Sequence, residues 1–383
     1  MSSAPIKVGF VGLSANGWAA TSLGPALLDP SLKGVYELKA VSTSNADSAA
    51  ASAAKHSDLT GSSVKPYHGS TSAIAEDENV DLVAISVKAP LHRDAVLPVI
   101  QKGKNFFLEW PAGKSLQETE EIRAAAQKKG VKTFIGLQAR VSPVVQKVKQ
   151  LIDSDAIGKV QSSTFVAVVP SDIHMWSPTP NGSGHNRYAL DASNAVTPLT
   201  VGVGHLLDPI IYTLGHLTTI TAVSSQVHPI LKLTDADGKE TSETLQSQFD
   251  EHFTFGGQFP NGAHSSFTLR FGGKFFPGRK TVRWEIEGEK GHILLESENI
   301  FGAFINVTSP RLFLNGEEVA VLGVQSGASE AVGILVDQWK EYAKGEQEGK
   351  YATIDDAVIL RRTLDAIAQS AREGKRVELD LKL

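Results

Sequence analysis

Roughly the first 140 residues alternate short apolar runs with longer stretches of helical pattern. The runs are rich in β-branched residues, which indicates buried strands, and the Ala-rich stretches 46–55 and 116–129 indicate covering helices, the second with Ser115 as its N-cap. The expected strands are IKVGFVGL (6–13), YELKAVST (36–43), VDLVAISV (80–87), NFFLEW (105–110) and TFIGLQ (133–138). Strands separated by helices need crossover connections, so the pattern predicts a domain over 1–140 with a doubly wound parallel sheet.

The pattern of apolar and polar residues changes after a helical stretch at 142–157. Apolar and polar residues then alternate in runs bounded by Gly, Pro and Asn, which predicts a second domain over 141–383, built on a large and mostly antiparallel sheet. The polar segment 170–195 is too long for a plain connector and is a candidate substrate loop. The expected strands are 160–169, 220–228, 247–255, 263–271, 281–288 and 292–297, and the expected closing helices are 330–344 and 354–372.

A glycine-bearing turn follows the first expected strand. Gly12 and Gly17 have the spacing of the first and third glycines of a dinucleotide fingerprint, with Ser14 in place of the middle one. Such a turn directs backbone amides and a helix N-terminus at a pyrophosphate. The alternative is a turn that serves only strand-to-helix packing. The position of this turn after the first strand of the alternating pattern favours cofactor binding.

The end of the second expected strand bears on the choice of cofactor. Ser42, Thr43 and Ser44 stand where an acidic residue would hold the adenosine ribose, and the first carboxylate is Asp47. Without a carboxylate to repel a 2'-phosphate, the site slightly favours NADP over NAD, although no arginine stands beside it. The alternative is that these are solvated turn residues.

Three further strand ends carry candidate chemistry. Lys88 and His92 lie in an expected loop after the strand 80–87, the turn Glu109-Trp110-Pro111 follows the strand 105–110, and Gln138 and Arg140 follow the last strand. Ligands of open α/β sheets bind at these carboxyl ends, so Lys88 is a candidate proton donor, although a loop lysine often only faces water. His205 begins an apolar helix and is the main acid–base candidate, with a structural histidine as its alternative.

Composition narrows the function classes. The 37 Lys+Arg and 42 Asp+Glu give a net charge of -5 without a long basic cluster, which argues against nucleic-acid binding. There is no cysteine, and the eleven histidines show no zinc-type spacing, so we expect neither disulfides nor a metal. The first strand begins almost at once and no apolar run is long enough to span a membrane, so we expect an intracellular, soluble, cytoplasmic protein.

Together, the KVGFVGLSANGWA turn, His92, the Glu-x-Pro turn and the Gly-His-x-x-Asp helix resemble the glucose-fructose oxidoreductase and inositol dehydrogenase (Gfo/Idh/MocA) family. The segments FFLEWPAGKSLQETE, FIGLQARVSP and 188–205 narrow the resemblance to the fungal branch that includes the yeast galactose-regulon repressor. The resemblance implies a Rossmann half, an antiparallel-sheet half, a bound NAD or NADP, and a homodimer through the sheet of the second half.

The resemblance also assigns residues. It implies a cofactor site formed by Gly12, Ser14, Asn16, Gly17, Trp18, Ser42, Thr43, Ser86, His92, Glu109, Trp110, Pro111 and Gln138, and a turn in which the Trp110–Pro111 bond can be cis. His205 matches the family's catalytic histidine, and Trp176, Tyr188, Asp191 and Arg140 are candidates for the substrate site. The proton-donating lysine of the family is Trp110 here, and the acidic residue four before the histidine is Val201.

Two functions follow from this pattern. The first is an NAD(P)-dependent oxidoreductase acting on a carbohydrate-like or other small alcohol or carbonyl compound, with His205 and Lys88 as acid–base candidates. The second is a non-catalytic NAD(P)-binding regulator that masks an activator protein, which would extend its location to the nucleus. A plain dinucleotide binder is a third, weaker interpretation.

Overall fold

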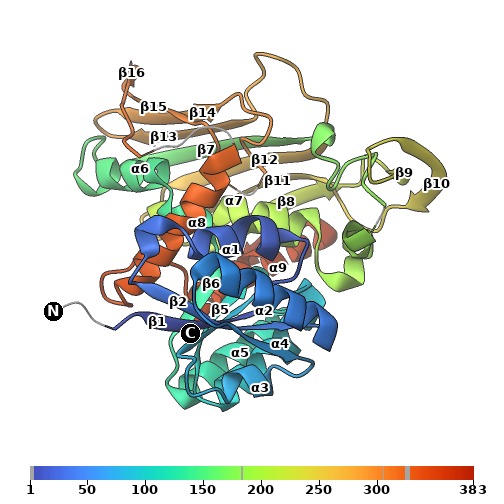
Figure 1. Ribbon diagram of the computed structural model, residues 1–383. Coiled ribbons are helices and arrows are strands. Elements are labelled where there is room, and N and C mark those ends of the chain that lie inside the picture. The colour runs from blue at the N-terminus through green and yellow to red at the C-terminus, as the bar shows by residue number, and fades with distance from the viewer. Residues whose placement is uncertain (1–3, 183, 305, 324–327) are drawn as a thin grey trace. The chain divides into compact units, whose positions relative to one another are not determined.

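The protein was analysed as a computed structural model, which describes residues 4–182, 184–304, 306–323 and 328–383 (Figure 1). The chain forms two compact units, each described by itself below. The first comprises 1–138 and 331–358, and the second comprises 139–330 and 359–383. The predicted boundary near residue 140 stays a prediction, and the assignment of 331–358 to the first unit was not foreseen.

The first unit contains a six-stranded parallel sheet in the order β3-β2-β1-β4-β5-β6. This order reverses direction between β1 and β4, as in dinucleotide-binding sheets, and it confirms the predicted Rossmann-type architecture. The strands are β1 (Ile6–Val11), β2 (Tyr36–Thr43), β3 (Lys65–His68), β4 (Leu82–Ile85), β5 (Asn105–Glu109) and β6 (Thr133–Gly136).

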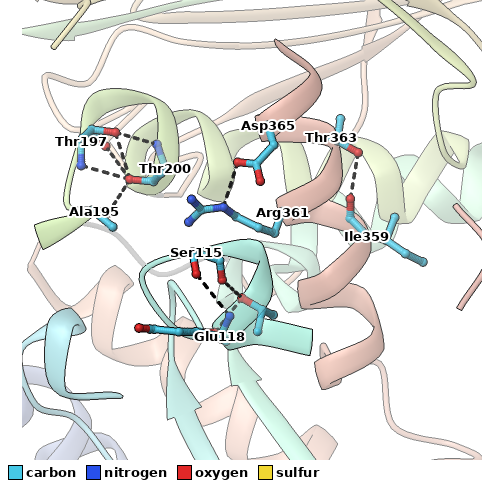
Figure 2. A network of polar contacts seen from close by, with 11 residues as sticks. Ser115, Glu118, Ala195, Thr197, Thr200, Ile359, Arg361, Thr363 and Asp365 are labelled. Atoms are coloured by element: carbon cyan, nitrogen blue, oxygen red, sulfur yellow. Dashed lines mark hydrogen bonds and ion pairs between the residues drawn. The ribbon is translucent and has the colours of Figure 1, made fainter. Parts of the chain in front are cut away.

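Capping side chains and left-handed glycines set the ends of the two long helices among 1–138. Asn45 accepts from the Ser48 amide at the start of α2, and Ser115 accepts from the Glu118 amide at the start of α5, as predicted from the sequence (Figure 2). Gly61 and Gly130 end these helices with positive φ. The α-helices of the first unit are α1 (Gly24–Leu27), α2 (Ala46–Thr60), α3 (Ser72–Ala75), α4 (His92–Gln101), α5 (Leu116–Lys129) and α8 (Ala328–Ala343), whose first residues belong to the second unit.

An aromatic cluster joins α8 to the six-stranded sheet. The Trp339 ring lies 5.2 Å from Tyr36 and 5.4 Å from Phe107 and Phe134, centroid to centroid, and only 1% of Trp339 is exposed. The Tyr36 hydroxyl donates to the Trp339 carbonyl at 2.8 Å. A helix some 200 residues downstream therefore completes the core of the first unit.

The second unit is built on a nine-stranded mixed sheet in the order β16-β15-β14-β13-β7-β12-β11-β8-β17. All neighbouring strands are antiparallel except β7 and β12, which confirms the predicted mostly antiparallel sheet. The strands are β7 (Val160–Pro170), β8 (Thr219–Ser225), β11 (His252–Gln258), β12 (His264–Gly273), β13 (Val282–Gly288), β14 (His292–Ser297), β15 (Arg311–Leu314), β16 (Glu317–Glu318) and β17 (Val377–Glu378). A separate hairpin contains β9 (Ile230–Thr234) and β10 (Glu240–Gln246).

Helices α6 (Pro143–Asp153), α7 (Gly204–Leu214) and most of α9 (Ile354–Glu373) belong to this unit. The π-helix Pro198–Val203 leads into α7 and begins with a reciprocal capping box between Thr197 and Thr200 (Figure 2). Apolar residues of α7 such as Leu206 and Ile210 face Phe165, Phe255 and Phe267 of the sheet.

The structure differs from the expected elements in a few places. The predicted strand 247–255 begins only at His252, and the Glu251 carboxylate just before it accepts from the amides of Val227 and His228. His92 is the first residue of α4 rather than part of a loop. The segment 170–195 forms short 3-10 helices, and its residue 183 lies outside the described residues. Across the described helices, none is long and apolar enough to cross a membrane.

We predict that the aromatic cluster is a main source of stability in the first unit. Trp339→Ala should lower the free energy of unfolding by about 3–5 kcal/mol, because it removes a fully buried ring. Leu59→Ala is the matched control, since Leu59 is 65% exposed and should cost less than about 0.5 kcal/mol. Urea unfolding followed by circular dichroism would measure both, and equal effects would contradict the role given to α8.

Candidate functional site

The carboxyl ends of β1, β2 and β4 meet at Gly12. The Gly12 amide donates to the Ser42 carbonyl at 2.8 Å, and a Cβ placed on Gly12 would lie 2.0 Å from the Ser86 carbonyl oxygen. Gly12 also has a φ of +93°, so both its conformation and its neighbours exclude a side chain. The packing of the strand ends therefore requires glycine at the switch point of the sheet, and the cofactor contact of Gly12 stays a prediction.

The rest of the glycine loop is held by its own backbone. The Ser14 hydroxyl donates to the Asn16 carbonyl at 3.1 Å, and the amides of Ala20 and Thr21 donate to the Gly17 carbonyl. A short π-helix, Ala19–Leu23, then leads into α1. The Ser14 side chain thus stabilises the loop, and the turn keeps the form expected of a pyrophosphate site.

The predicted ribose residues at the end of β2 are less accessible than expected. Only 1% of Ser42 and 8% of Thr43 are exposed, and the Thr43 hydroxyl donates to the Asn45 carbonyl at 3.2 Å. Ser44, the next residue, is exposed. The cofactor contact of Ser42 and Thr43 stays a prediction, and Ser44 is better placed to reach a ligand.

The end of β5 carries an unusual carboxyl group. The indole N–H of Trp18, directly after the glycine loop, donates to Oε1 of Glu109 at 3.2 Å. Glu109 pairs with Gly136 of β6, where a Cβ would lie 2.7 Å from Oε2. Burial raises the pKa of Glu109 to about 8, against the opposing hydrogen bonds from Trp18 and the Trp110 backbone. The carboxyl group is therefore mostly protonated at neutral pH.

The Glu109-Trp110-Pro111 turn is fixed by His92. The Trp110–Pro111 bond is cis, and 5% of Trp110 is exposed. Nδ1 of His92 lies 2.8 Å from the Pro111 carbonyl, and Nε2 lies 3.0 Å from the Val87 carbonyl. Burial lowers the pKa of His92. A neutral imidazole has one N–H and can donate to only one of these carbonyls, so the histidine predicted to bind the cofactor lies between the turn and the segment after β4.

The remaining predicted residues of the first unit lie at the same edge of the sheet or close to it. Ser86 follows β4 and supplies the carbonyl beside Gly12, and Lys88 is exposed just before α4. Gln138 is 2% exposed after β6. The first unit therefore brings the predicted pyrophosphate, ribose and nicotinamide residues together along one edge.

His205 lies in the second unit, in the first turn of α7. It is 4% exposed, and within the described part of the chain its Nδ1 atom has no hydrogen-bond partner. Burial lowers the pKa of His205 to about 4, so the imidazole is neutral near pH 7. A buried ring nitrogen without a partner is uncommon in proteins, and the acid–base role of His205 stays a prediction.

Arg140, a predicted substrate residue, is engaged within the second unit. Its Nε atom donates to the Asp208 carboxylate at 3.0 Å, and a second nitrogen also bonds that carboxylate. Both side chains are buried, and the guanidinium lies 5.2 Å from the Tyr212 ring centre. This bidentate pair ties the segment after β6 to α7, which is a structural role.

The substrate residues predicted in the loop 170–195 differ in their surroundings. Trp176 is 2% exposed, its indole donates to the Val196 carbonyl at 3.0 Å, and its ring packs on Phe271, so it is a core residue. Tyr188 is partly buried, and burial raises its pKa. Asp191 is exposed, and hydrogen bonds from Ser193 lower its pKa. Of these residues only Tyr188 and Asp191 keep the access that substrate contact needs.

Sequence reasoning named Trp18 and Glu109 but missed that they bond each other. It also missed Gly136, whose missing side chain makes room for the carboxyl group. The signal was present, because Gly136 lies inside the expected strand 133–138, and glycine in a strand often marks a close approach. Of the described residues, no three or more His, Asp or Glu form a group able to hold a metal ion.

The two halves of the chain match two different protein families. Residues 6–137 match the family described as "Oxidoreductase family, NAD-binding Rossmann fold". Residues 143–297 match the family described as "Gal80p, C-terminal domain".

Individual relatives fall into two groups. Dehydrogenase aclE of Aspergillus oryzae is 28% identical over 97% of both chains. The galactose/lactose metabolism regulatory protein GAL80 of Saccharomyces cerevisiae is 28% identical over 80% of this chain and 70% of its own. A super-repressor mutant of that protein superposes with a TM-score of 0.87 at 24% identity over 98% of both chains. A levoglucosan dehydrogenase in complex with NADH and L-sorbose has a TM-score of 0.76 at 19% identity, covering 98% of this chain and 99% of its own.

We predict unequal roles for the two loop glycines. Gly12→Ala should lower the free energy of unfolding by more than about 3 kcal/mol, because a positive φ and a collision with Ser86 add together. Gly17→Ala is the matched control, with the same φ of +93° and nothing within 4 Å of the added Cβ. It should cost about 1–2 kcal/mol. Urea unfolding would compare them, and equal losses would contradict the close approach at Ser86.

We predict that His205 makes the protein sensitive to acid. Its pKa rises from about 4 in the folded chain towards the ordinary value of 6.5 on unfolding. The unfolded state therefore binds the proton first, and stability present above pH 6.5 is lost as the pH falls to about 4, by up to about 3 kcal/mol. His205→Gln should remove this loss, and His264→Gln, at an exposed strand position, should keep it. Identical pH profiles of unfolding for the wild type and His205→Gln would refute the prediction.

Proposed function

We propose that this chain, in which residues 6–137 match the oxidoreductase family with an NAD-binding Rossmann fold and residues 143–297 match the Gal80p C-terminal domain, is an NAD(P)-dependent oxidoreductase. It would transfer hydride between the nicotinamide and a carbohydrate-like or other small alcohol or carbonyl compound. The observation that carries the proposal is the glycine turn at the switch point of the sheet, where Gly12 leaves no room for a side chain.

The residues at this edge fit a dinucleotide. Gly12, Ser14, Asn16, Gly17 and Trp18 would surround the pyrophosphate, and the end of β2 would reach the ribose. Glu109, Trp110 and Pro111 would flank the nicotinamide, with His92 holding their turn. When bound, the cofactor supplies or accepts the hydride, and the protein supplies orientation and a proton.

Either NAD or NADP could be the cofactor, and we propose a slight preference for NADP. The exposed residue after β2 is Ser44, and Asp47 lies in the first turn of α2 rather than at the strand end. A ribose 2'-phosphate would therefore meet hydroxyl groups before it meets a carboxylate.

The similarity of this chain to enzymes over nearly its full length supports a catalytic function. The chain aligns with almost all of Dehydrogenase aclE, and a levoglucosan dehydrogenase with the same fold binds NADH and L-sorbose. His205 is the predicted acid–base residue. Its neutral, buried ring can accept a hydrogen bond from a substrate hydroxyl, but a pKa of about 4 makes it a weak base.

A second candidate is a non-catalytic NAD(P)-dependent regulator whose partner is an activator protein. Trp110 favours it, because an indole cannot exchange a proton at neutral pH, and so does the likeness to GAL80. This candidate shares the cofactor site and the proposed homodimer through the C-terminal sheet. It differs in its location, which would include the nucleus as well as the cytoplasm.

We predict that cofactor binding quenches tryptophan fluorescence and that a panel of sugars, lactones, aldehydes and polyols contains a substrate. NADPH and NADH should quench the tryptophan emission of the wild type. Trp110→Phe should lose part of this quenching but should still bind the cofactor in calorimetry. Turnover should fall at least about 100-fold in His205→Ala if that ring positions the reacting oxygen. Binding without turnover of any compound, together with specific capture of an activator protein, would establish the regulator instead.

A further inference from the structure

The chain has a protonatable group one residue before Trp110. Glu109 is the last residue of β5, beside the ends of β4 and β6, and so lies at the same edge of the sheet as Gly12. Its side chain is partly exposed, which leaves a path for proton exchange. None of the roles assigned so far to this edge uses its acidity.

Two contacts from other elements hold the carboxyl group. Oε1 accepts from the Trp18 indole at 3.2 Å, and Trp18 follows Gly17 of the glycine loop. Oε2 lies over Gly136 of β6, where even a methyl group would approach to 2.7 Å. The carboxyl group is therefore fixed between the pyrophosphate loop and the last parallel strand.

Titratable groups on the surrounding segments bond elsewhere or face solvent. The ring nitrogens of His92 lie next to the carbonyls of Val87 and Pro111, away from Glu109, and the Glu118 carboxylate accepts from the Lys114 amide. Lys88 is exposed. Throughout the described residues, no charged side chain pairs with the Glu109 carboxyl or shifts its titration. Burial without a cation raises its pKa to about 8, within reach of neutral pH.

We infer that Glu109 is the proton donor and acceptor of this site, taking the role that the residue at position 110 cannot perform. The inference rests on the proposed function, because it assigns a proton to the hydride-transfer reaction. Its geometric basis is the carboxyl group fixed between Trp18 and Gly136 next to the predicted nicotinamide turn.

The step balances without a further reactant. In reduction, the bound dinucleotide would supply the hydride to the carbonyl carbon of the substrate, and Glu109 would donate its carboxyl proton to the carbonyl oxygen. The products are an alcohol, the oxidised cofactor and a Glu109 carboxylate, which regains a proton from water. In oxidation, the carboxylate takes the hydroxyl proton as the hydride leaves the carbon.

The ionisation can be tested without cofactor or substrate. Infrared spectra of the wild type, recorded from about pH 6 to about pH 10, should show a protonated carboxyl band that disappears with a midpoint near 8. Tryptophan emission should change with the same midpoint, because the indole of Trp18 bonds this carboxyl group. The carboxyl band should be missing in Glu109→Gln. The change in emission should be missing in Glu109→Gln and in Trp18→Phe. Both signals should persist in Glu78→Gln. A Glu109 carboxyl group ionised throughout this range would overturn the inference.

The proton role is tested on a compound that the wild type turns over. Reduction should slow as the pH rises through about 8, and oxidation should accelerate over the same range. Glu109→Gln keeps an acceptor for the Trp18 indole, so cofactor affinity should change less than about threefold while kcat falls at least about 100-fold without that pH dependence. Glu78→Gln, at an exposed position, should match the wild type.

The outcomes separate the two proposals. Wild-type turnover by Glu109→Gln would overturn the proton role and leave hydride transfer standing. A titrating Glu109 in a protein that turns over no compound would instead overturn the proposed function, and the proton role with it. Loss of folding in Glu109→Gln would show in circular dichroism. Glu109→Asp would then replace it, since a shorter acid should keep the pH dependence with a reduced rate.

Discussion

The close approach of three strand ends at Gly12 is the constraint on which the candidate site depends. The Ser42 carbonyl accepts from the Gly12 amide, and the Ser86 carbonyl comes so near that residue 12 can have no side chain. The left-handed conformation of Gly12 turns the chain out of the sheet. That turn places Trp18 where its indole reaches Glu109 at the end of β5, two strands along the sheet order from β1. The contact between Trp18 and Glu109 therefore depends on the close packing at the end of β1.

The tryptophan at residue 110 has an electrostatic consequence beyond the loss of a proton donor. A lysine there would put a cation beside the Glu109 carboxyl group and would favour its ionised form. With an indole in its place, burial acts on Glu109 without opposition from a neighbouring cation, and the acid keeps its proton near neutral pH. The residue change therefore transfers acid–base capacity to its neighbour rather than only removing it.

Sequence patterns predicted the parallel sheet, the mostly antiparallel sheet and the glycine turn, because each rests on local periodicity or on a short motif. They did not predict β3, whose KPYH segment is a mostly exposed edge strand with no apolar alternation. They also did not reveal the ion pair of Arg140, since polarity along the chain does not identify a partner such as Asp208, which is 68 residues away. The substrate contacts of Trp176 and Arg140 stay predictions. The Trp18–Glu109 bond spans 91 residues and was hidden for the same reason.

The contribution of α8 to the first unit has a consequence for synthesis of the chain. A nascent chain that has just completed β6 has the whole parallel sheet, yet Phe107 and Phe134 still lack Trp339. Roughly 200 more residues must be added before that helix exists, which takes on the order of 10–40 s at usual elongation rates. During this interval an apolar face of the nucleotide-binding half is uncovered, so the newly made protein should depend on chaperones for longer than its N-terminal fold alone would suggest.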